Sequence, residues 1–151
     1  MKNNLLWKET AEAVISRAQK LQADTQPLWG KMTVTEMLHH CNKVHDQLLT
    51  PAEPTAKGTS IKQYLVRWVV LYAMPRYPKG AQAPKKFHTK GTIDESEFEK
   101  EKQAFIASVE RFANYNQPIA HWHPYFGKLS TEQWGLTSWK HVDHHLRQFG
   151  V

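Results

Sequence analysis

Apolar residues recur at helical spacing in five segments of the chain, and no convincing pair of alternating segments predicts two paired strands. The five segments cover about residues 4–23, 33–49, 61–73, 94–112 and 130–149. Four are long, whereas 61–73 is shorter and lies within a long connection. The pattern predicts one all-α domain over residues 1–151, a helix bundle with a long crossover that carries an extra short helix.

Local signals mark where several of these helices begin and end. Thr33-Val34-Thr35-Glu36 and Ser130-Thr131-Glu132-Gln133 are capping boxes, in which the first and fourth residues satisfy each other's backbone N–H groups. The 94–112 segment opens with four residues, Asp94 to Glu97, three of them acidic and suited to the positive end of a helix. Pro75 stops the short helix, and Gly150 is suited to end the last one.

Composition places the chain among ordinary globular proteins. It has 151 residues, of which 40% are hydrophobic and 23% charged. The most apolar stretch, 64–74, is far shorter than the roughly 18 residues a membrane span needs. Glu9 and Glu12 stand where a signal peptide would continue apolar, and one cysteine excludes an internal disulfide. We therefore expect a cytoplasmic protein with no membrane partner.

The net charge of +6 is concentrated in one loop. Arg76, Lys79, Lys85, Lys86 and Lys90 lie between Pro75 and Thr92 without an acidic residue. A basic face along a helix would favour nucleic acid, which we do not expect here. A local cluster is typical of a solvated loop, and binding of an anionic ligand is the alternative.

The last helical segment carries three histidines, in the stretch WKHVDHHLRQF. At about 100° per residue, its apolar stripe contains Trp139, Val142, Leu146 and Phe149. His141 and His145, four residues apart, fall together on one border of this stripe. His144 falls near Lys140 and is predicted to face solvent. The His141–His145 spacing allows two imidazoles on one helix face to bind the same metal ion.

A third ligand is expected from a facing helix, and 33–49 offers the stretch MLHHCNKVH. His40 lies on a border of the apolar stripe and is the matching candidate, whereas His39 points outward. His45 lies on the opposite border and is the rival candidate. Cys41 lies at the centre of the stripe, so a buried, unreactive thiol is favoured over a ligand.

Taken in their order along the chain, these features resemble the DinB-like superfamily of metal-binding four-helix bundles. The resemblance lies in Trp29 and Thr33 before a helix with His40, and in His141, His145, Arg147 and Gln148 in the last helix. The segment HPYFGKL before the last helix is similar to an uncharacterised branch of the superfamily. The resemblance implies that His40, His141 and His145 bind one divalent transition-metal ion, with Zn, Ni or Fe favoured.

The resemblance also implies a function. It indicates a metal-dependent enzyme, a thiol-dependent transferase or a hydrolase acting on a small molecule, with a low-molecular-weight thiol as a further cofactor of the transferase. The alternative is a non-catalytic, stress-associated metal- or ligand-binding bundle. Such bundles often form homodimers through an apolar helix face, so we expect a homodimer.

Two further residues near the ligands have open roles. Glu36 lies one turn before His40 and is a candidate partner for its imidazole, although its capping-box role is favoured. Trp134 lies two turns before His141 and is predicted either to line the pocket or to pack in the core.

Overall fold

The structure is a computed structural model and describes residues 3–80 and 88–151. The described part is mostly helical, with a small two-stranded sheet. In chain order the elements are α1 (Lys8–Ala18), α2 (Val34–Leu49), α3 (Ile61–Trp68), the π-helix η1 (Val69–Ala73), the 3-10 helix η3 (Glu95–Glu97), α4 (Phe98–Ala113), β1 (Trp122–His123), β2 (Gly127–Lys128) and α5 (Thr131–Gln148).

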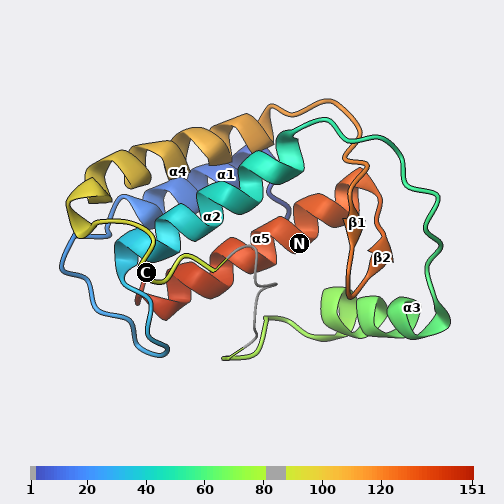
Figure 1. The fold of residues 1–151 in the computed structure, drawn as a ribbon, viewed down its shortest axis with the longest axis horizontal. Helices are drawn as coiled ribbons and strands as arrows, with labels where there is room; N and C mark the ends of the chain where they lie inside the picture. The colour runs from blue at the N-terminus through green and yellow to red at the C-terminus, as the bar shows by residue number, and fades with distance from the viewer. Residues whose placement is uncertain (1–2, 81–87) are drawn as a thin grey trace.

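The helices α1, α2, α4 and α5 lie side by side around one hydrophobic core and are called the helical body below (Figure 1). Both α1 and α2 contact α4 and α5. The core includes Met37, Phe105, Phe112 and Leu146, whose side chains are fully buried. Among the described residues, no helix has the length and apolar character needed to cross a membrane.

The predicted capping boxes are confirmed at the start of α2 and α5. In each, the Thr33 or Ser130 side chain accepts the N–H of the fourth residue, whose side chain accepts in return. The first helix is shorter than predicted. Residues 4–7, where this helix was predicted to start, are not helical. Leu5 instead donates its backbone N–H to the Gly135 carbonyl of α5 at 3.1 Å. A Cβ on Gly135 would lie 2.0 Å from Asn4 Oδ1, so only glycine allows this approach.

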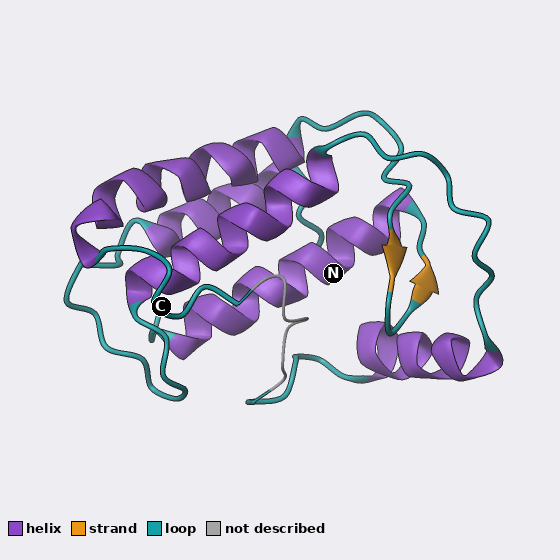
Figure 2. Ribbon diagram, in the orientation of Figure 1, coloured by secondary structure: helices purple, strands orange, loops and turns teal. Residues whose placement is uncertain are grey.

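The prediction of a strictly all-α fold is wrong at one place, the antiparallel hairpin of β1 and β2 (Figure 2). Each strand has only two residues, too few for an alternating pattern to show in the sequence. The turn is held by His123, whose Nδ1 accepts the N–H groups of Tyr125 and Phe126. Gly127, at φ +70°, closes the turn in the left-handed region.

The expected extra helix of the crossover is present as α3 followed by η1. It lies apart from α1, α2 and α4, on the far side of the hairpin in Figure 1. The change to a π-helix at Val69 coincides with a contact to α5. Lys140 donates from Nζ to the Val70 and Met74 carbonyls, at 2.6 Å each. This ammonium satisfies carbonyls at the end of η1 and ties the crossover to the helical body.

Candidate metal centre

The structure brings His40, from α2, together with His141 and His145, from α5. One ring nitrogen from each lies within 4.8 Å of the other two. His40 Nε2 and His141 Nε2 lie 2.9 Å apart. Centroid separations of the three rings are 4.8–5.0 Å. This confirms that the three predicted ligands form one cluster between two helices.

These three histidines fit a single transition-metal ion. Nitrogen ligands at about 2.0–2.1 Å from a tetrahedral ion lie roughly 3.3 Å apart. The His40–His141 pair is slightly closer than this, and the wider separations require small side-chain adjustments. The three imidazoles supply no negative charge, and as a group they could hold one metal ion.

Electrostatics favour the neutral imidazoles that a metal ion requires. Burial, followed by the nearby His40, lowers the pKa of His145 to about 3. Burial, followed by His145 and His40, holds the pKa of His141 well below its usual value. A protonated imidazole cannot bind a metal ion, so both groups remain available as ligands at neutral pH.

Gln148 fixes which nitrogen of His145 carries the proton. Its Nε2 donates to the Trp29 carbonyl at 2.8 Å, so its Oε1 is turned toward His145 Nδ1, 2.9 Å away. The Nδ1 atom must then carry the proton, and the lone pair of Nε2 is left for a metal ion. The loop at Gly30 is shaped around this contact, because a Cβ there would lie 2.7 Å from Gln148 Nε2.

We expect Gln148→Leu to weaken metal binding without preventing it. The leucine has a similar size but accepts no proton from His145, so the imidazole loses its preferred tautomer and orientation. Loss of such a supporting group typically lowers metal affinity by about 10–100-fold. Competition with a chromophoric chelator measures the affinity. Gln133→Leu is the control on the same helix, and an equal loss there would contradict the role of Gln148.

His144 is not where the sequence predicted it. We expected it to face solvent with Lys140, but both are buried, at 7% and 3% exposure. The His144 ring lies edge-on to that of Trp29 at 5.8 Å. Burial lowers the pKa of His144, and the nearby Tyr77 backbone opposes this shift. The crossover and the Trp29 loop cover this side of α5, which a helical wheel cannot show. His144 still lies outside the ligand cluster.

The rival histidine, His45, is also outside the ligand cluster. It faces α4, where Nδ1 lies 2.8 Å from Ser108 Oγ and the ring packs against Phe105 and Phe112. The expectation for Cys41 is confirmed, since the side chain is fully buried and burial strongly raises the pKa of its thiol. A protonated, buried thiol is not a metal ligand.

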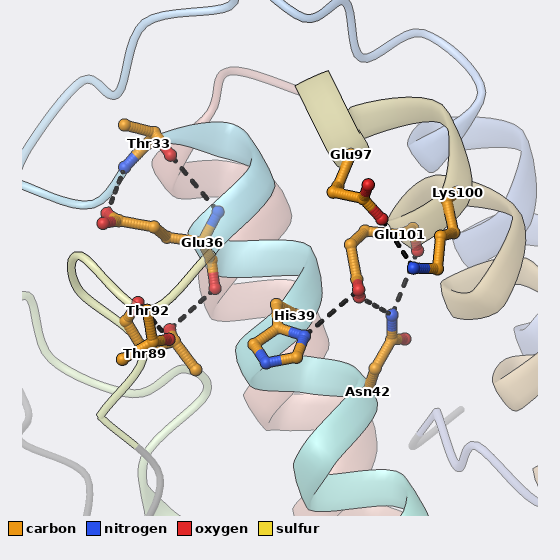
Figure 3. Close-up of polar contacts among 9 residues, drawn as sticks. All are labelled: Thr33, Glu36, His39, Asn42, Thr89, Thr92, Glu97, Lys100 and Glu101. Carbon is orange, nitrogen blue, oxygen red and sulfur yellow. Dashed lines mark hydrogen bonds and ion pairs between the residues drawn. The ribbon is translucent and has the colours of Figure 1, made fainter. Parts of the chain in front are cut away.

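Figure 3 shows the surroundings of α2 on its outer side. Glu36 accepts the N–H of Thr33 with Oε2 and that of Gly91 with Oε1, so both carboxylate oxygens are occupied and the capping-box role is confirmed. His39 points away from the cluster, as predicted, and its Nδ1 lies 3.2 Å from Glu101 Oε1 of α4.

Trp134 packs at the end of the helical body near the hairpin. It is 5% exposed, and its ring lies 5.5 Å from that of His123. These contacts favour the core-packing alternative over a wall of the metal centre.

The sequence analysis did not predict the hydrogen bond between Gln148 and His145. The signal that could have indicated it is the position of Gln148, three residues after His145 on the same helix.

The basic loop is only partly described. Lys85 and Lys86 lie outside the described residues. The described ends of the loop lie beside both helices that carry the histidines. The Tyr77 backbone lies near His144 of α5, and Thr89 donates to the Glu36 carbonyl of α2 at 2.8 Å. Lys79 Nζ lies 4.7 Å from the Trp29 ring.

Comparison with known proteins gives one match. A family model described as "Protein of unknown function (DUF1569)" matches residues 1–150. No curated protein and no solved structure matches the chain significantly.

Proposed function

The chain belongs to the DUF1569 family of proteins of unknown function, and we propose that it is a DinB-like four-helix bundle that binds one divalent transition-metal ion. The helical body supplies the four helices, and His40, His141 and His145 supply the ligands. The observation that carries the proposal is the convergence of three ring nitrogens, from two helices, within 4.8 Å.

The reaction we propose is thiol-dependent group transfer or hydrolysis on a small molecule. Three neutral ligands leave the double charge of an ion uncompensated and leave a coordination position open, as in catalytic rather than structural sites. A divalent ion held in this way lowers the pKa of a bound water or thiol toward neutrality. Zn, Ni and Fe suit these ligands, and a low-molecular-weight thiol is the second cofactor of the transferase alternative.

The residues of the chain have separate tasks in this proposal. His40, His141 and His145 hold the ion, and Gln148 orients His145. His40 and His145 are 3% and 9% exposed, which limits the access of bulk water to these two ligands. Ser138 lies one turn before His141 in α5, and its buried hydroxyl has no hydrogen-bond partner among the described residues. That hydroxyl is available to a small polar ligand beside the ion.

We propose that the substrate is anionic. Support comes from the described cations of the basic loop, Arg76, Lys79 and Lys90, which lie in a stretch without acidic residues between Glu53 and Asp94. The positions of Tyr77 and Thr89 place the two ends of this loop beside α5 and α2. Cations near such a site attract anionic molecules and increase their rate of encounter.

A non-catalytic metal- or ligand-binding bundle is the second candidate, and one observation favours it. His40 and His145 are 3% and 9% exposed, and His141 is only partly exposed. A site with so little exposure binds an ion while giving a substrate little room to reach it.

Turnover measured with and without metal separates the two candidates. The metal-loaded protein is tested for conjugation of 1-chloro-2,4-dinitrobenzene with small thiols and for hydrolysis of p-nitrophenyl esters. The enzyme proposal expects turnover that is lost on chelation, regained when one metal ion is restored, and absent in His145→Ala. One tightly bound ion per chain with no turnover of either probe would favour the non-catalytic bundle.

A further inference from the structure

The segment formed by α3 and η1, residues 61–73, is called the arm below. Every residue of α3 is described, and none is buried. Ile61, Leu65 and Trp68 are 81%, 64% and 62% exposed, and three further large side chains of the arm are also exposed: Tyr64, Val69 and Tyr72. These positions follow the i, i+3, i+4, i+7 spacing of one helix face. The arm therefore presents a continuous apolar stripe to solvent.

The side of the arm that faces the rest of the protein is mixed, because Val66 and Val70 pack against the core and Leu71 is buried, while two polar side chains contact the hairpin. Arg67 donates from Nη1 to the Lys128 carbonyl at 2.6 Å, and Gln63 donates from Nε2 to the Pro124 carbonyl at 3.0 Å. Both carbonyls belong to the hairpin region. A surface helix of a monomer normally turns its apolar stripe inward and its polar side outward. Here the arm exposes a large apolar stripe in addition to its contacts with the core, which indicates that another surface covers the stripe.

The size of the stripe suits a stable protein interface. Large side chains at these exposures present on the order of 100 Å² each, or roughly 600–700 Å² for the six together. A typical monomer has a largest apolar patch of about 300–600 Å². A stable complex buries about 800 Å² on each partner. Tyr125, 56% exposed in the hairpin next to Pro124, extends the apolar surface beside the arm.

We propose that the arm is the dimer interface of this protein, covered by the same stripe of a second copy about a two-fold axis. Homodimer interfaces are more apolar than other interfaces, and two-fold dimers are the most common soluble assembly. An anionic lipid surface would require a basic collar around the stripe. Arg67 binds the hairpin and Lys57 lies 5.2 Å from the Trp122 ring. The exposed Lys62 of α3 and Lys128 of β2 are too few to form such a collar.

Charge placed in the stripe tests the proposal. Analytical ultracentrifugation over a concentration series is expected to show a wild-type dimer. Leu65→Glu and Trp68→Glu should each raise the dimer dissociation constant at least about 30-fold, as loss of a central contact does. Leu28→Glu is the matched control, because Leu28 is 70% exposed but lies outside the arm. It should remain dimeric, and unchanged helical circular dichroism and metal content in all three variants show that folding is intact.

A single-cysteine scan locates the two-fold axis. The chain has one cysteine, Cys41, which is buried, so a cysteine introduced at Ile61, Leu65, Trp68 or Tyr72 is the accessible thiol. At least one of these variants should form a disulfide-linked dimer under mild oxidation, whereas Leu28→Cys should not. A wild-type monomer at 100 µM, or dimers that persist in both glutamate variants, would overturn the proposal. Binding of the monomer to anionic vesicles, lost in Leu65→Glu, would instead assign the stripe to a lipid surface.

Discussion

Replacing His145 with alanine is expected to remove almost all bound metal, from about one ion per chain to a small fraction. His145 is one of three ligands, and Gln148 holds it with Nε2 free for the ion. Two remaining imidazoles on different helices bind an ion far more weakly than three. Metal analysis of purified, folded protein measures the loss.

His144→Ala is the matched control, because it changes the neighbouring histidine on the same helix. His144 lies outside the cluster but packs against Trp29, so this variant should lose some stability and keep its metal. Equal metal loss in the two variants, or none in either, would show that the assigned ligands are wrong.

Metal removal should also lower the thermal stability of the wild type. An ion that binds only the folded protein, at about a hundred times its dissociation constant, stabilises it by roughly 2.7 kcal/mol. In a domain of this length, that corresponds to a decrease in Tm of several degrees on chelation. Melts of His145→Ala with and without chelator should superimpose. A wild type whose melt is also unchanged after confirmed metal loss would show that the ion does not tie α2 to α5.

The second large effect is loss of stability in mild acid. Burial lowers the pKa of His45 to about 3, and that of His123 to about 4. In the unfolded chain these groups titrate near 6.5. As pH falls below about 6.5, these two histidines are protonated in the unfolded chain but remain neutral in the folded protein. The free energy of unfolding therefore falls by about 1.4 kcal/mol per pH unit for each such histidine, until pH approaches its folded-state pKa.

The substitution His45→Leu removes one of these two titrating groups. Urea unfolding of the metal-free protein at pH 7, 6 and 5 should show a pH slope about 1.4 kcal/mol per unit smaller than wild type. Ser108→Ala is the control, because it removes the hydroxyl beside His45 Nδ1 but leaves the ring buried. It should lower stability at every pH by about 1–3 kcal/mol and keep the wild-type slope. A slope in His45→Leu equal to the wild-type slope would contradict the burial argument.

The sequence by itself predicted most of the helices and the three histidines that the structure brings together. Capping boxes and apolar periodicity are local, so the starts of α2 and α5 were predicted at the correct residues. The borders of the apolar stripes selected His40, His141 and His145 because a helix fixes the direction of each side chain. The resemblance to a known pattern added the pairing between the two helices, which periodicity alone does not give.

Only the tertiary structure decided what covers each helix face. His144 and Lys140 have the polar character and wheel positions of solvent-facing residues. They are buried because the crossover and the Trp29 loop, distant in sequence, lie over them. The arm is the opposite case, since its apolar residues are exposed. Its apolar residues form a helical stripe like that of a core helix, yet hydrogen bonds from Gln63 and Arg67 to the hairpin turn the stripe outward. A periodic pattern gives the direction of a side chain relative to its own helix, and long-range contacts decide whether that direction leads to protein or to water.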